Sequence, residues 1–196
     1  MKVPQLGITF KKLSEAFIVQ HFLSDRSLIK QKHLIEVADK CNDKLSNSNY
    51  DYQRDYNKLI DDQQIFWLLD YIRDVYELNY NTPLILLNSA VIKLRPGHNL
   101  NLHNHLDEYD INNSPDISCL YCLKVKDVNV DDWSKNSVCM IHYDDHRWKQ
   151  KKWQVPIERK KFILFNSSLN HSVINKENDD MILLSFQFQT LGTATK

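Results

Sequence analysis

Three histidines have the residue type and the spacing that a mononuclear metal centre requires. His103 and His105 form an H-x-H pair on a segment that reads as a strand, and His171 follows the apolar segment 161–165. Residues two apart on a strand point to the same face, so both imidazoles can reach one metal ion at about 2 Å. A third imidazole from the far edge of a β-barrel would complete the set. The spacing therefore predicts a mononuclear non-haem iron centre, with His103, His105 and His171 as candidate ligands.

A pair of cysteines could also bind a metal or undergo redox chemistry. Cys119 and Cys122 form a C-x-x-C motif inside a predicted strand, 117–125. Residues three apart on a strand point to opposite faces, so the two sulfurs diverge. No second Cys or His pair follows at zinc-ribbon spacing. We therefore expect buried structural thiols in a reducing compartment.

The composition limits the number of domains and the class of partner. The chain has 196 residues, with 25 Lys and Arg against 25 Asp and Glu. This length suits a single domain, 1–196. The zero net charge gives no long-range attraction to nucleic acid or to an anionic membrane, and no apolar segment has the length of a signal peptide core or a membrane span. We expect a cytoplasmic protein with neither a nucleic-acid nor a membrane partner.

Residues 1–82 read as a helical support region. One predicted helix begins near Ser24 or Ser27 and buries a stripe of apolar residues at helical spacing, namely Leu28, Ile35, Ala38, Cys41 and Leu45. A second begins at Asp61-Asp62 and ends at 79–83, with a wider apolar face. These helices are expected to support the part of the chain that carries the histidines.

The pattern changes to short strands from Pro83, which predicts a β core over 83–190. The strands are expected at 84–95, 99–103, 117–125, 137–143, 161–166 and 181–189. In the second of these, Leu100 and Leu102 should face away from His103. The polar segment 106–116 reads as a loop over the site. Helices followed by many strands predict an α+β fold, with the helices packed outside a β-sandwich or barrel.

From about residue 90 to 188, the order of the motifs resembles the superfamily of 2-oxoglutarate- and iron-dependent oxygenases. It is most similar to a family common in phages and marine bacteria. The resemblance rests on five segments: His103-Asn104-His105-Leu106, then 117–123, 140–147, 163–173 and 184–188. It implies a double-stranded β-helix, a jelly-roll barrel like that of the cupins. It also implies Fe(II) as cofactor, 2-oxoglutarate as cosubstrate and, if the chain is virus-encoded, a place in the host cytoplasm.

The resemblance leaves the third metal ligand open. The superfamily usually has H-x-D/E at its first ligand pair, because two imidazoles and one carboxylate leave Fe(II) three facial positions. Here the second position is His105. Asp107 or Glu108 could supply a carboxylate if the loop folds back. Otherwise the centre has three histidines, as in some cupin-type dioxygenases.

The resemblance also places an Arg at 181 and a Ser at 183, where they grip the distal carboxylate of 2-oxoglutarate. This chain has Met181 and Leu183, and a buried carboxylate without a cationic partner is costly. A basic group elsewhere would have to replace the Arg. The candidates are Lys93, Arg95, Lys124 and Arg147. Lys124 is favoured, because other branches of the superfamily bind 2-oxoglutarate with a lysine on a strand. Tyr121 could add a hydroxyl group.

The resemblance thus implies a 2-oxoglutarate-dependent hydroxylase with a small-molecule or peptidyl substrate. Two alternatives from other classes stay open. The first is a barrel without 2-oxoglutarate that serves as a binding or scaffold module, which Met181 and Leu183 favour. The second is a cupin-like dioxygenase with three histidines.

Overall fold

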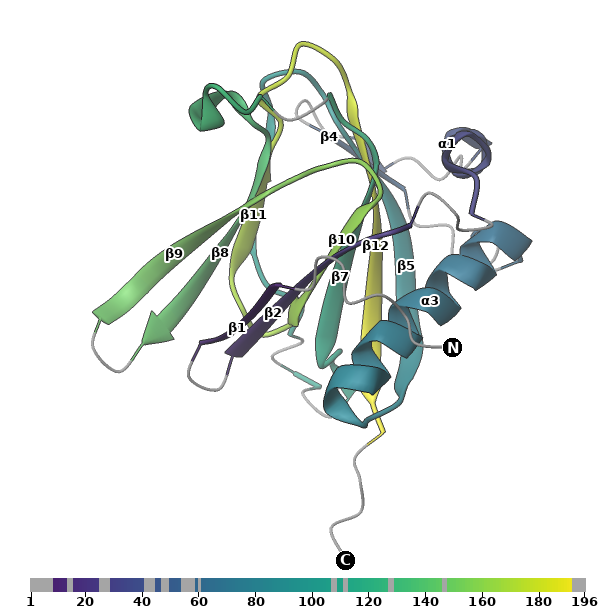
Figure 1. Ribbon diagram of the computed structural model, residues 1–196, viewed down its shortest axis with the longest axis vertical. Helices are drawn as coiled ribbons and strands as arrows, with labels where there is room; N and C mark the ends of the chain where they lie inside the picture. The colour runs from purple at the N-terminus through teal and green to yellow at the C-terminus, as the bar shows by residue number, and fades with distance from the viewer. Residues whose placement is uncertain are drawn as a thin grey trace, which may run out of the picture.

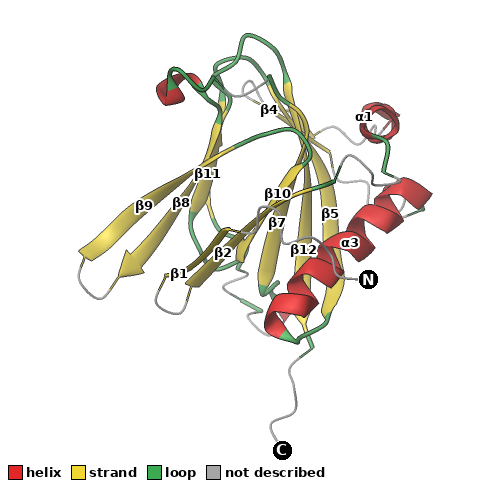
Figure 2. Cartoon of the chain, viewed as in Figure 1, coloured by secondary structure: helices red, strands yellow, loops and turns green. Residues whose placement is uncertain are grey.

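The computed structural model has two antiparallel sheets facing each other, with helices outside one of them (Figures 1 and 2). It describes residues 9–13, 16–24, 29–40, 45–46, 50–53, 59, 61–106, 109–110, 113–126, 129–145 and 148–191. Within these ranges, the side chains of 9–16, 45–53 and 145–150 are not described.

The large sheet has eight strands in the order β1-β2-β10-β7-β12-β5-β4-β3, all with antiparallel neighbours. Their bounds are Thr9–Leu13 (β1), Ala16–Phe22 (β2), Leu45–Ser46 (β3), Tyr50–Gln53 (β4), Leu84–Leu94 (β5), Ile117–Lys124 (β7), Lys161–Asn166 (β10) and Met181–Thr190 (β12).

The small sheet has four antiparallel strands in the order β6-β11-β8-β9. Their bounds are Asn99–His103 (β6), Val138–Asp145 (β8), Trp148–Pro156 (β9) and His171–Ile174 (β11). Consecutive strands from β5 to β12 alternate between the two sheets, apart from the β8–β9 hairpin, which stays in the small sheet. This arrangement confirms the predicted double-stranded β-helix.

The large sheet is buried on both faces, which explains why its central strands are apolar without interruption. On β12, Ile182, Leu184, Phe186 and Phe188 belong to the cluster on the helix side. Met181 and Leu183 belong to the cluster between the sheets. The same division separates Cys119 from Cys122 on β7, so the two thiols diverge as expected.

Two helices, α1 (Gln31–Lys40) and α3 (Gln63–Tyr80), lie on the outer face of the large sheet (Figure 2). The Asp62 side chain accepts hydrogen bonds from the backbone N–H groups of Gln64 and Ile65 and so caps α3. The helix ends at Asn81, which has the left-handed conformation at φ 52°. These bounds confirm the second predicted helix. None of the helices that the structure describes is long and apolar enough to cross a membrane.

The expectation of a helical region over 1–82 is wrong in part, because β1, β2, β3 and β4 add four strands to the large sheet. In β2, Ile18 packs between the sheets and Val19 packs on the helix side. A strand buried on both faces has neither a helical stripe nor strict alternation, so its pattern gave no clear signal. The first helix is also shorter than expected: Leu45 lies in β3, and Cys41 is outside the described residues.

Candidate metal centre

The three predicted ligands converge between the sheets. His103, His105 and His171 each offer a ring nitrogen, and these atoms lie within 4.8 Å of one another. The ring centroids are 4.3 Å apart for His103 and His171, 4.9 Å for His105 and His171, and 5.0 Å for His103 and His105. Three nitrogens this close can bind one ion on one side, which leaves its other face open.

A bulge between β6 and β11 turns His103 inward. The register pairs His171 with His103 but Val173 with Leu100, so three steps on β6 match two on β11. Leu100 and His103 can therefore both face the interior, and Leu102 turns outward with 52% of its surface exposed. The expectation that Leu100 and Leu102 share a face is wrong for this reason.

His105 lies two residues beyond the end of β6, where no ladder holds it. Its backbone N–H donates to the carbonyl of Ser167 at 3.0 Å, which ties it to the turn between β10 and β11. This contact keeps His105 on the same side as His103, although the strand has already ended.

The ring hydrogen bonds leave Nε2 of two histidines available for a metal. His103 Nδ1 lies 2.8 Å from the Asn101 carbonyl oxygen, and His171 Nδ1 lies 3.1 Å from that of Leu169. A carbonyl only accepts, so Nδ1 carries the proton and Nε2 keeps its lone pair.

His171 shows most clearly that a metal fits. It is 1% exposed, and its Nε2 has no hydrogen-bond partner among the described residues. A buried polar atom without a partner costs about 1–3 kcal/mol. Burial, with smaller contributions from His103 and His105, lowers the pKa of His171 to about 3. The ring is therefore neutral at physiological pH, as a metal ligand must be.

Side chains from two other strands hold His105. Its Nδ1 lies 2.7 Å from Nε2 of Gln187 on β12, and Gln187 Oε1 lies 3.0 Å from Nδ2 of Asn88 on β5. A half-turn of both the Gln187 and the Asn88 amide would place Gln187 Oε1 against Nδ1, and Asn88 Oδ1 would then accept from Gln187 Nε2. In that arrangement His105 donates from Nδ1, and its Nε2 is available for a metal. Sequence reasoning missed Gln187 and Asn88, because their place beside His105 follows from the pairing of β12 with β5, in which Gln187 is opposite Asn88.

The other predicted site residues do not join this cluster. The hydroxyl of Tyr121 donates to Gln31 Oε1 at 2.7 Å, on the helix side of the large sheet, and burial raises its pKa. Lys124 and Arg95 are exposed at the ends of β7 and β5 that lie away from the histidines. Lys93 pairs with Asp39 of α1 at 2.6 Å, outside the barrel. Asp107, Glu108 and Arg147 are outside the described residues.

The interior at Met181 and Leu183, the positions expected to hold the distal carboxylate, is filled with apolar side chains. Met181 is 0% exposed and Leu183 is 1% exposed. The cavity beside Leu183 holds about 10 Å³, close to the room for one water molecule. It is also lined by Lys161, whose ammonium donates to Glu158 Oε1 and to the Pro156 carbonyl oxygen, both at 2.9 Å. Among the described residues, the expected position for the distal carboxylate of 2-oxoglutarate therefore does not fit that group.

Neither a protein-family model nor a curated protein matches the sequence. Solved structures match the fold. The carbocyclase SnoK from nogalamycin biosynthesis, described as non-heme and alpha-ketoglutarate dependent, has a TM-score of 0.62 and 11% identity over 87% of this chain and 78% of its own. HygX from Streptomyces hygroscopicus, with nickel, 2-oxoglutarate and hygromycin B bound, has a TM-score of 0.58 and 15% identity over 89% and 82%.

A prolyl hydroxylase from Trichoplax adhaerens, in complex with a peptide fragment, has a TM-score of 0.62 and 13% identity over 89% of this chain and 83% of its own. At identities this low, the structural likeness establishes the fold alone. The chain has the double-stranded β-helix of the 2-oxoglutarate- and Fe(II)-dependent oxygenases, and its histidine triad could hold a metal ion.

Proposed function

We propose that this chain is a mononuclear non-haem Fe(II) oxygenase whose metal is held by His103, His105 and His171. The observation that carries the proposal is the convergence of three imidazoles, one of which has a buried Nε2 without a hydrogen-bond partner among the described residues. Three nitrogen ligands on one face would leave the other positions of the ion open to small ligands. A bound Fe(II) would supply O₂ activation. The chain's own part is to fix the three rings and to exclude water.

Hydroxylation that depends on 2-oxoglutarate, which the sequence resemblance implies, is the second candidate. Its support is the fold, together with two neighbours. HygX is described with nickel and 2-oxoglutarate bound, and the epimerase SnoN with Fe³⁺, alpha ketoglutarate and nogalamycin RO. In this chain, the candidate requires a partner for the distal carboxylate other than Tyr121, Lys93, Lys124 or Arg95. A small-molecule or peptidyl substrate is proposed for either candidate, as in the neighbours that have hygromycin B or a peptide bound.

Anaerobic titration of the metal-free protein with Fe(II) tests the proposal. We expect one ion per chain and at least tenfold weaker binding in His103→Ala, His105→Ala and His171→Ala, as for the loss of a ligand or its support. His142→Ala is the matched control, because His142 lies on β8 beside Ile141 but on the opposite face. Addition of nitric oxide to the Fe(II) protein should give the EPR signal of an iron nitrosyl, which requires an open position.

Three results would count against the proposal as stated. If the protein binds no Fe(II), the barrel serves as a binding or scaffold module. If the three alanine variants bind Fe(II) as tightly as the wild type, any bound metal lies elsewhere. If His105→Ala alone binds normally, a carboxylate such as Asp107 supplies the third ligand.

A further inference from the structure

We infer that this metal centre works without a 2-oxo diacid. It would instead incorporate both atoms of O₂ into a compact, metal-chelating substrate with an apolar or aromatic body. The inference rests on the proposed function, since it concerns the ligands that a metal at the histidine triad can accept. The structural basis is the juxtaposition of the triad with a barrel interior in which the described residues leave no place for a second carboxylate at the level of Leu183.

The strand registers place the interior side chains in rows beneath the histidines. Phe165, Ser118 and Gln187 form the row at the level of the triad, where the Phe165 ring lies 4.7 Å from that of His171. The next row, two residues along each strand, consists of Ile163, Leu120 and Ser185. Two residues of a strand span about 6.7 Å, so the far end of a diacid chelated at the triad would lie in the second or third row.

The third row is closed to an anion. It contains Leu183 opposite Cys122, with Lys161 next to them on β10. Leu120, Leu183 and Ile163 leave room for about one water molecule there. A carboxylate moved into this space would lose its hydration and would find apolar groups on most sides.

Lys161 is the one cation that lines this space among the described residues, and it is already neutralised. Its side chain is 4% exposed, and its ammonium lies 2.9 Å from Glu158 Oε1 and 5.3 Å from the centre of the Phe22 ring. A second carboxylate would have to compete for the same ammonium with Glu158, whose side chain is 29% exposed and already pairs with it. Lys161 therefore closes the bottom of the site and does not anchor a ligand.

The electron balance then determines the reaction class. Reduction of O₂ to the level of two bound oxygen atoms takes four electrons, and a 2-oxo acid would supply two of them. Without it, the substrate supplies all four. In the dioxygenation that we propose, the O–O bond and one carbon–carbon bond of the substrate break, each of the two carbons gains a bond to oxygen, and both oxygen atoms stay in the product. No proton, leaving group or further reductant is needed.

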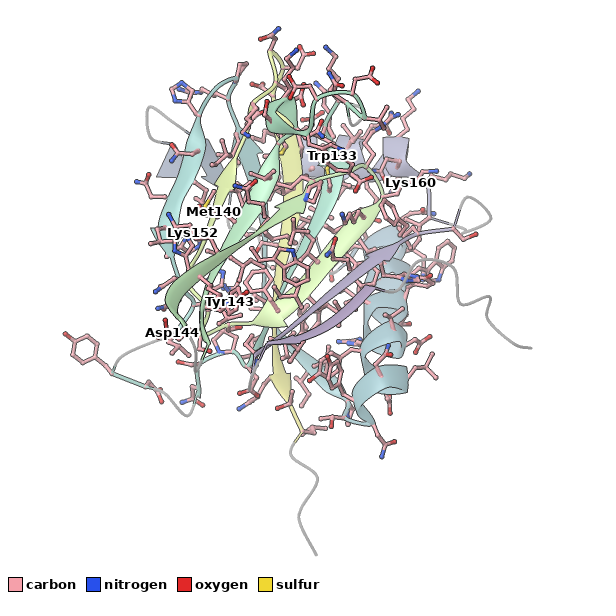
Figure 3. All side chains as sticks on the ribbon, turned by 60° about the vertical axis from the view of Figure 1, so that its left-hand side comes forward. Trp133, Met140, Tyr143, Asp144, Lys152 and Lys160 are labelled. Atoms are coloured by element: carbon pink, nitrogen blue, oxygen red, sulfur yellow. The ribbon has the colours of Figure 1, made fainter. Side chains whose placement is uncertain are left out.

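The side chains around the open side of the triad indicate the body of the substrate. Ile141 is opposite His171, and Trp153 is opposite Ile141 on the β8–β9 hairpin. Tyr143, two residues beyond Ile141, packs with Trp153 against the cluster between the sheets. Figure 3 shows Tyr143 and Asp144 toward the end of this hairpin, away from Trp133. Together with Phe165, these aromatic side chains suit a flat or apolar group.

Calorimetry on the nickel-loaded protein tests the inference, with catechol as a compact aromatic chelator and 2-oxoglutarate as the diacid. We expect catechol to bind and 2-oxoglutarate to bind at least a hundredfold more weakly, with the metal-free protein as the blank. In the double variant Met181→Arg/Leu183→Ser, 2-oxoglutarate binding should increase at least tenfold over that of Leu183→Ser alone.

The outcomes separate this inference from the proposed function. Failure to bind nickel or Fe(II) refutes the metal centre itself. A metal-loaded wild type that binds 2-oxoglutarate as well as it binds catechol overturns the inference, above all if Lys161→Met removes that binding. A folded double variant that gains no affinity would show that Met181 and Leu183 are not what excludes the diacid, which also overturns the argument.

Discussion

At the scale of single residues, the three histidines differ in what fixes their rings. Backbone carbonyls two residues earlier hold His103 and His171, so no side-chain substitution removes those contacts. His105 instead depends on the side chain of Gln187, which Asn88 holds in turn. This difference makes His105 the ligand whose orientation can be changed without altering any histidine.

Gln187→Leu should weaken metal binding while the fold stays intact. The leucine cannot hydrogen-bond to Nδ1 of His105, so the ring loses the contact that fixes its orientation. Loss of such an outer contact typically lowers metal affinity about 10–100-fold. Calorimetric titration with Co(II) measures the affinity, and the visible Co(II) spectrum reports the change in coordination.

Gln187→Glu provides the rescue, because its carboxylate can accept a hydrogen bond from Nδ1 and should retain most of the affinity. Gln154→Leu, at an exposed position on β9, is the matched control. Equal Co(II) affinity and equal spectra for Gln187→Leu and the wild type would show that Gln187 does not position His105.

The sequence predicted the three histidines because their types and spacing carry the chemistry directly. It could not predict Gln187, Asn88 or Lys161, whose roles depend on which residues the strand registers place beside one another. Tyr121 illustrates the same limit: it is one residue away from an inward-facing position, and the alternation of β7 sends it to the helix side. The role of a basic or hydroxyl residue on a strand cannot be predicted until the face of the sheet on which it lies is known.

At the scale of elements, α3 supports the large sheet from outside through its buried face. Its start depends on Asp62, whose side chain caps the first turn and also lies 2.8 Å from His33 Nε2 of α1. The first-turn hydrogen bonds and His33 hold the pKa of Asp62 below its usual value, despite an opposing effect of burial. One residue thus begins α3 and joins it to α1.

Asp62→Ala should lower the free energy of unfolding by about 1 kcal/mol, the usual value for loss of an N-cap. The two N–H groups of Gln64 and Ile65 would lose their acceptor. Urea unfolding followed by circular dichroism measures the change. The neighbouring, exposed Asp61→Ala is the control, and an equal loss in both variants would show that capping is not the cause.

His21 makes the contact between β2 and α3 sensitive to pH. It is 5% exposed, its Nε2 lies 2.6 Å from the Tyr71 hydroxyl oxygen, and burial lowers its pKa. The folded state therefore binds fewer protons than the unfolded state below the unfolded pKa of about 6.5. Stability from this residue is present above that pH and decreases as the pH falls.

We expect the unfolding free energy to decrease from about pH 7.5 to about pH 5.5, by no more than about 1.4 kcal/mol per pH unit for one group. His21→Gln should show a smaller decrease, because Gln does not titrate in this range. Urea unfolding at both pH values measures the difference. The same decrease in both proteins would assign the effect to other groups.

The elements could be predicted where one pattern dominates. The strands β5, β6, β7, β8, β10 and β12 and the helix α3 follow the expected bounds to within about two residues, the usual uncertainty at element ends. The missed strands have specific causes: β2 is apolar on both faces, β9 carries several lysines and glutamines, and β11 has only four residues. The bulge in β6 also could not be predicted from the sequence, because it depends on the pairing of β6 with β11.

At the scale of the whole molecule, the two faces of the large sheet belong to separate buried clusters. The cluster between the outer face and the two helices contains 23 buried residues. It is the larger of the two buried clusters and lies on the side of the sheet away from the histidines. The inner face shares a second cluster of 16 buried residues with the small sheet, and the triad lies at one end of it. The small sheet carries two of the ligands, and Gln187 on the large sheet holds the third.

This arrangement predicts that the metal stabilises the contact between the sheets. In the metal-free protein, the buried Nε2 of His171 has no partner among the described residues, and the three imidazole rings lie close together. A ligand that binds only the folded state adds about 2.7 kcal/mol at a concentration 100 times its dissociation constant. Addition of Co(II) to chelator-treated protein should therefore raise the Tm by several degrees. The same addition to His171→Ala should not, because the buried ligand is gone. A shift of equal size in both proteins would place the stabilising ion outside the triad, and the triad would then be a packing contact between β6 and β11.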